Sequence, residues 1–124
     1  MAVIIDKKTR DNLKGEIREI MVNQAAINKT IYYQEICNKC RSAKLNPNDQ
    51  LLNDILGEIS YESYSDGKGM LSVFAVNKKG GSPGDGFFSY AKQLGCSIGS
   101  REKFVKDQMD FVHNQYRDPN VLKF

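Results

Sequence analysis

The residues best suited to chemistry are three cysteines and the single histidine. Cys37 and Cys40 form a C-x-x-C pair, a spacing that lets two sulfurs reach one zinc ion. A tetrahedral site needs two more ligands, and only Cys96 and His113 remain, far apart in the sequence and outside any second close pair. A thioredoxin-like role would need a strand before the pair in a βαβ unit, which the pattern lacks. We expect reduced thiols, with no metal and no cofactor.

Residues 80–84 read Gly-Gly-Ser-Pro-Gly, which formally satisfies G-x-S-x-G. That motif needs a strained strand-to-helix turn that exposes the serine beside an oxyanion hole. Pro83 follows Ser82 and removes the backbone N–H that would donate to the oxyanion, and His113 falls within a helical pattern. We therefore expect a protein that is not an enzyme.

Four glycines and a proline within residues 78–86 predict an irregular loop. Its backbone amides could converge on a phosphate, but the G-x-x-x-x-G-K-[ST] order of a nucleotide-binding loop is missing. Basic residues flank this loop and others, and they predict contacts with a nucleic-acid backbone; the candidates are Lys68, Lys78, Lys79, Lys44 and Arg41. A plain solvated turn that binds nothing is the competing interpretation.

An acidic stretch, residues 49–66, contains no lysine or arginine. A helix that reads DNA usually presents Arg, Lys, Asn or Gln, so this stretch would be a poor reader. Its acidic and tyrosine side chains favour instead a protein-binding surface made by Glu58, Tyr61, Glu62 and Tyr64. The second hypothesis is thus a protein-interaction module, such as an immunity, antitoxin or inhibitor protein.

Hydrophobic periodicity indicates the elements that must position these residues. Leu13, Ile17 and Met21 recur at helical spacing, and Thr9 is a candidate N-cap. We expect a helix over 9–24, a short strand or turn at 31–33, a short helix over 34–40, a helix from Asn46-Pro47 through Ile59, a strand over 70–76, a helix over 87–94 and a last helix from Ser100 to Asp118-Pro119.

These elements predict an α+β fold, a small and mostly helical domain with a short sheet. Their order matches a winged-helix domain, and it is also compatible with other α+β packings. A chain of 124 residues with 40% hydrophobic and 27% charged residues has the size and composition of one ordered domain, residues 1–124.

Three segments, Leu56-Gly57-Glu58-Ile59-Ser60, the run from Met70 to Lys78 and Pro83-Gly84-Asp85-Gly86-Phe87-Phe88, resemble a pattern of small uncharacterised bacterial proteins. This resemblance covers about residues 30–95. The segment from Thr30 to Ile36 is also faintly similar to the winged-helix DNA-binding half of the alkyltransferase-like proteins. Their active-site Pro-Cys-His-Arg pattern is absent, since Gly95 and Ser97 flank Cys96, so alkyl transfer is not implied.

The sequence also bears on location and partners. No apolar run approaches 18 residues, and the first ten residues place an apolar patch before lysines, the reverse of a signal peptide. We expect a cytoplasmic protein without membrane contact. A net charge of +3 permits binding to phosphate but does not demand it, so nucleic acid is favoured over a protein partner by topology and resemblance.

Overall fold

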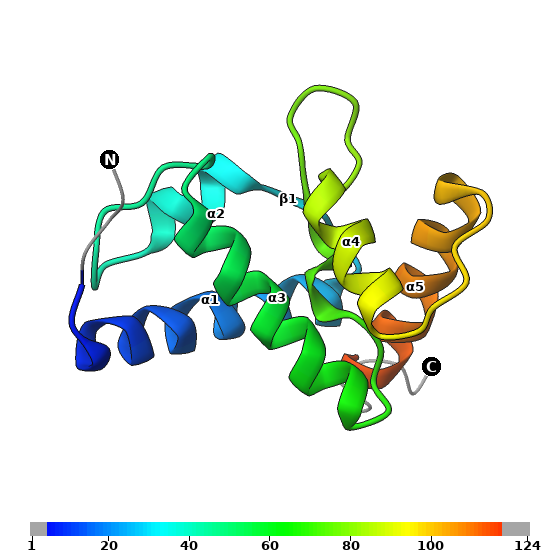
Figure 1. Cartoon of the computed structure of the whole chain (residues 1–124), viewed down its shortest axis with the longest axis horizontal. Helices are drawn as coiled ribbons and strands as arrows, with labels where there is room; N and C mark the ends of the chain where they lie inside the picture. The colour runs from blue at the N-terminus through cyan, green and yellow to red at the C-terminus, as the bar shows by residue number, and fades with distance from the viewer. Residues whose placement is uncertain (1–4, 118–124) are drawn as a thin grey trace.

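The computed structural model describes residues 5–117. Within that range the chain is mostly helical with a short two-stranded sheet, as the predicted α+β class requires (Figure 1). The elements are α1 (Lys7–Ile27), β1 (Ile31–Tyr32), α2 (Tyr33–Lys39), α3 (Gln50–Ser65), the 3-10 helix η1 (Leu71–Phe74), β2 (Ala75–Val76), α4 (Asp85–Gln93) and α5 (Arg101–Tyr116). None of these helices combines the length and apolar character needed to cross a membrane.

The core surrounds the run from Met70 to Val76, every residue of which is buried. Helices α1, α3 and α5 all pack against η1 at its centre. The predicted strand over 70–76 is wrong for most of its length, because only Ala75 and Val76 pair with another strand. Ser72 instead donates its backbone N–H to the side chain of Ser60 on α3. Burial on all sides removes the alternation that distinguishes a strand from a compact helical turn.

Several predicted helix boundaries shift because other groups cap the helices. Asp6, and not Thr9, caps α1: its carboxylate accepts the Thr9 N–H at 2.7 Å. Asn46 does not begin α3 but accepts the Asp49 N–H in a turn, and the helix starts at Gln50. Ser100 caps α5 as predicted, whereas Asp118-Pro119 lies outside the described residues.

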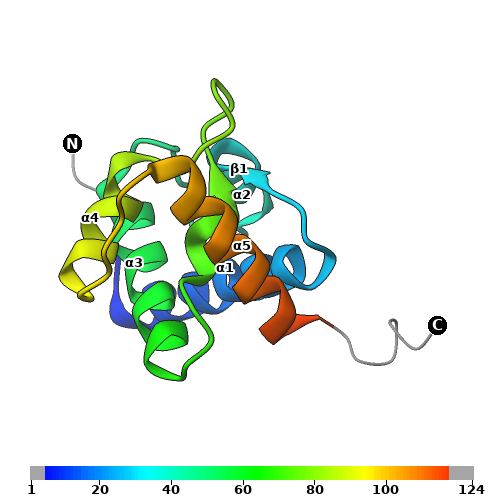
Figure 2. The same ribbon diagram turned by 90° about the vertical axis from the view of Figure 1, so that its right-hand side faces the viewer.

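The two strands are parallel, with Ile31 opposite Ala75. Parallel strands end at the same edge of their sheet, so α2, which follows β1, and loop 77–84, which follows β2, leave the sheet together. The loop then returns to α2, where the Gly84 N–H donates to the Tyr33 hydroxyl at 2.9 Å. Figures 1 and 2 both show this loop projecting from the upper side of the molecule.

Glycine allows α4 to approach α3 closely. A Cβ on Gly57 would lie 2.2 Å from the ring carbon Cζ of Tyr90, and one on Gly86 would lie 2.5 Å from Oδ1 of Asn53. Both distances are far below van der Waals contact. Gly57 and Gly86 therefore each have a packing reason to be glycine.

Candidate nucleic-acid interface

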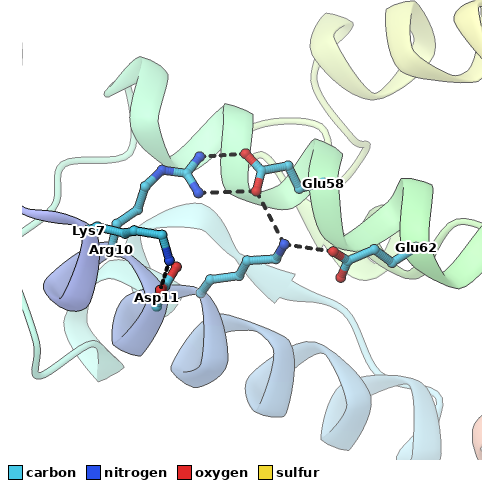
Figure 3. A network of polar contacts seen from close by, with 6 residues as sticks. Lys7, Arg10, Asp11, Glu58 and Glu62 are labelled. Atoms are coloured by element: carbon cyan, nitrogen blue, oxygen red, sulfur yellow. Dashed lines mark hydrogen bonds and ion pairs between the residues drawn. The ribbon is translucent and has the colours of Figure 1, made fainter.

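Two of the three acidic side chains of α3, Glu58 and Glu62, form ion pairs within the fold, whereas Asp54 forms none among the described residues. Arg10 of α1 donates two hydrogen bonds to the carboxylate of Glu58, at 3.1 and 2.5 Å. Lys14, one turn later, contacts Glu58 at 3.2 Å and Glu62 at 2.7 Å (Figure 3). The hydrogen bonds from Arg10 lower the pKa of Glu58 below its ordinary value. Two carboxylates that the sequence leaves unbalanced are thus balanced by two cations.

The predicted protein-binding residues do not form one surface. Glu58, Tyr61 and Glu62 line a cleft of about 370 Å³ that α1, α3 and α4 enclose. Tyr64 lines a different groove, next to Phe111 of α5. Tyr61 is 60% exposed and Tyr64 37%, so the hydroxyphenyl groups are accessible on separate faces.

Four of the five predicted phosphate contacts lie in two exposed loops. Lys78 and Lys79 are in loop 77–84, and Arg41 and Lys44 are in the segment 40–49 that joins α2 to α3. Among the described residues none of these four side chains takes part in an ion pair. Figure 2 shows both segments in the upper part of the molecule; in Figure 1 loop 77–84 projects from the top, and segment 40–49 lies to its left, beyond α2. The fold therefore brings cations from distant sequence positions to one side.

Lys68 does not belong to this group. It lies in the loop between α3 and η1, which both views show at the end of the molecule opposite loop 77–84. Its ammonium group lies 5.4 Å from the ring centre of Tyr116 on α5, a cation–π contact. The structure thus separates Lys68 from Lys78 and Lys79.

Loop 77–84 is held in shape by its own backbone. The Asn77 N–H donates to the carbonyl of Ser82, and the Gly81 N–H donates to the carbonyl of Asn77. Gly80 and Gly81 have φ angles of 94° and 64°, a conformation that glycine adopts without strain. The exposed lysines at 78 and 79 therefore sit on a closed turn.

A second feature, which the sequence analysis missed, is a polar hollow of about 370 Å³ between α2 and the segment that follows it. Arg41 and Lys44 line it together with side-chain amides and two of the three cysteines; its full lining is Gln34, Cys37, Asn38, Cys40, Arg41, Ala43, Lys44, Leu45 and Asn46. The sequence contained a signal for it, because Gln34 and Asn38 are four residues apart and such residues share one face of a helix.

Glu16 of α1 fixes the segment beside this hollow. Its carboxylate accepts the backbone N–H groups of Arg41, at 3.2 Å, and Ser42, at 3.0 Å. These backbone hydrogen bonds contribute to a lowered pKa of Glu16. Glu16 does not line the hollow, but it lines a neighbouring recess together with Arg41, whose side chain is exposed.

Cys37 and Cys40 line this hollow together, and His113 does not. Burial raises the pKa of Cys40 to about 11, and its thiol donates to the carbonyl of Ile36. His113 of α5 instead bonds through Nδ1 to the carbonyl of Ala25, at 2.8 Å. Across residues 5–117, no three His, Cys, Asp or Glu side chains gather where they could hold a metal ion.

Comparison with known proteins finds no matching family model, no matching curated protein and no matching solved structure. The resemblance of residues 30–95 to small bacterial proteins, and the fainter one to alkyltransferase-like proteins, stay predictions. Geometry and charge therefore carry the functional argument.

Proposed function

We propose that this chain is a non-catalytic nucleic-acid-binding accessory protein with a winged-helix-like arrangement. Loop 77–84 takes the place of the wing, and its lysines contact phosphate together with Arg41 and Lys44. The observation that carries the proposal is the parallel pairing of β1 with β2, because it starts the lysine loop and α2 at the same edge of the sheet.

The ion pairs of α3 support the same interpretation. A helix carrying unbalanced carboxylates would repel a phosphate backbone, but Glu58 and Glu62 are compensated by Arg10 and Lys14. Helix α3 itself is covered by α1, α4 and η1, so in this proposal it supports the surface and does not enter a groove. Contact comes from the loops on the upper side.

Salt dependence tests the proposal, because each neutralised phosphate adds about 0.9 to the slope of log K against log salt for duplex DNA and about 0.7 for a single strand. Replacing both Lys78 and Lys79 by alanine should lower the slope by roughly 1.4 to 1.8, with weaker binding to every sequence alike. Fluorescence anisotropy of labelled duplex DNA and single-stranded RNA, from low to near-physiological salt, measures it.

A matched control separates the site from net charge. Lys68 and Lys106 are exposed and lie elsewhere, in the loop after α3 and on α5. Replacing both by alanine removes the same two charges and should leave the slope within about 0.3 of the wild type. Equal decreases of the slope in the two double variants would show that only the total charge matters, and would refute the assignment of Lys78 and Lys79 as phosphate contacts.

A protein-interaction module remains the second candidate, and the cleft beside α3 favours it. Tyr61, Tyr90 and Leu94 give this cleft an apolar lining that a protruding side chain of a partner could fill. No binding to any nucleic acid at low salt would make this the leading proposal. Substituting Tyr61 should then weaken capture of the partner.

A further inference from the structure

The hollow between α2 and the segment 40–46 offers more than positive charge. Gln34 and Asn38 are exposed on one face of α2, and Nε2 of Gln34 donates to Oδ1 of Asn38 at 2.9 Å. That bond leaves the Gln34 carbonyl oxygen free to accept, and it leaves N–H groups of both amides free to donate. A base edge, which alternates donors and acceptors, is matched by such a pair.

The cations of the same hollow complement the amides. Arg41 and Lys44 line it together with residues of α2, and no carboxylate is among its lining residues. A guanidinium group can bind phosphate through its N–H donors or stack on a base, and an ammonium group binds phosphate as a point charge. The hollow thus presents a phosphate-binding part beside a base-reading part.

We infer that this hollow receives one unpaired nucleotide of a bound strand, with its phosphate at Arg41 and Lys44 and its base edge at Gln34 and Asn38. This inference rests on the proposed nucleic-acid binding and names the form of nucleic acid preferred. A recess of about 370 Å³ lies in the size range of small-ligand sites and suits a base turned out of a stack. In a duplex the same base edge is occupied by its partner.

Loop 77–84 extends the path of the strand. The Gly84 N–H binds the hydroxyl of Tyr33, the first residue of α2, so the end of the lysine loop lies against the start of this helix. A strand whose phosphates contact Lys78 and Lys79 can continue across α2 into the hollow. Separate residues thereby supply overall affinity and base preference.

The experiment measures anisotropy of labelled single strands made only of adenine, cytosine or thymine nucleotides, and of a hairpin duplex. Wild-type protein should bind the best single strand about tenfold more tightly than the worst, and more tightly than the duplex. Replacing Gln34 and Asn38 by alanine should reduce the differences between strands to about twofold while leaving the salt slope unchanged.

Asn114→Ala with Gln115→Ala is the matched control, since both are exposed carboxamides on α5, and it should keep the wild-type preferences. Circular dichroism of each variant checks that the helices remain. Unchanged preferences after removal of the α2 amides, or equal binding of duplex and single strand, would overturn the inference and leave the proposed function standing. Failure of the wild type to bind any strand would overturn both.

Discussion

Replacing Gly57 by alanine tests the close approach of α3 and α4. Two opposite effects act at this position. Alanine stabilises a helix interior by about 0.8 to 1 kcal/mol relative to glycine. The added Cβ, however, would lie 2.2 to 2.7 Å from three ring carbons of Tyr90, so the ring or the helices must move. Such overpacking costs about 1 to 3 kcal/mol.

Gly15 on α1 supplies the matched reference. It is also inside a helix, and a Cβ there would meet no heavy atom within 4 Å. Gly15→Ala should therefore raise the free energy of unfolding by about 0.5 to 1 kcal/mol. The free energy of unfolding of Gly57→Ala should be lower than that of Gly15→Ala by about 1 to 3 kcal/mol. The difference between the two variants isolates the contact from helix propensity.

Urea denaturation followed by circular dichroism gives the free energies, and a double-mutant cycle with Tyr90→Ala assigns the cause. Once the ring is removed, Gly57→Ala should become stabilising, by about 0.5 to 1 kcal/mol. A Gly57→Ala variant that is destabilised equally with and without the ring of Tyr90 would refute the packing explanation.

Two further predictions concern polar groups. Ser60→Ala should lower the free energy of unfolding by about 1 to 3 kcal/mol, because it leaves the buried Ser72 N–H without an acceptor. Ser72→Ala keeps that hydrogen bond and should lower it less; equal decreases measured by urea denaturation would contradict this asymmetry. Arg10 lowers the pKa of Glu58, so this pair stabilises the fold above the ordinary glutamate pKa and the contribution disappears as the pH falls through the lowered value. Arg10→Gln should therefore lower the free energy of unfolding by less than about 1 kcal/mol at neutral pH, since the pair is partly exposed, and should leave it unchanged near pH 2. A decrease of the same size at both pH values would count against this assignment.

The sequence predicted the long helices well because their apolar spacing is regular. Leu13, Ile17 and Met21 are all fully buried on one face of α1, and the periodic residues of α3 are buried as well, namely Leu52, Ile55, Leu56 and Ile59. It failed at residues 70–76, where every side chain is buried and no alternation remains to separate a strand from a 3-10 turn. Local pattern specifies an element only where one of its faces meets water.

The candidate site was predicted only in part, for a related reason. Lys78 and Lys79 could be found from sequence because they flank glycines, whose tolerance of positive φ marks an exposed turn. Lys68 looked equivalent by the same criterion, yet it lies at the opposite end and covers Tyr116. Loop composition predicts exposure but carries no information on which loops share a side of the molecule.

The acidic run over residues 49–66 shows why charge along a chain differs from charge on a surface. Arg10 and Lys14, which compensate Glu58 and Glu62, lie more than forty residues earlier in the sequence. Glu58 and Glu62 are therefore compensated within the fold, whereas Lys78, Lys79, Arg41 and Lys44 take part in no ion pair among the described residues. This compensation follows only from the packing of α1 on α3. That packing depends on the core, so the core sets the electrostatics of the candidate interface as well as its shape.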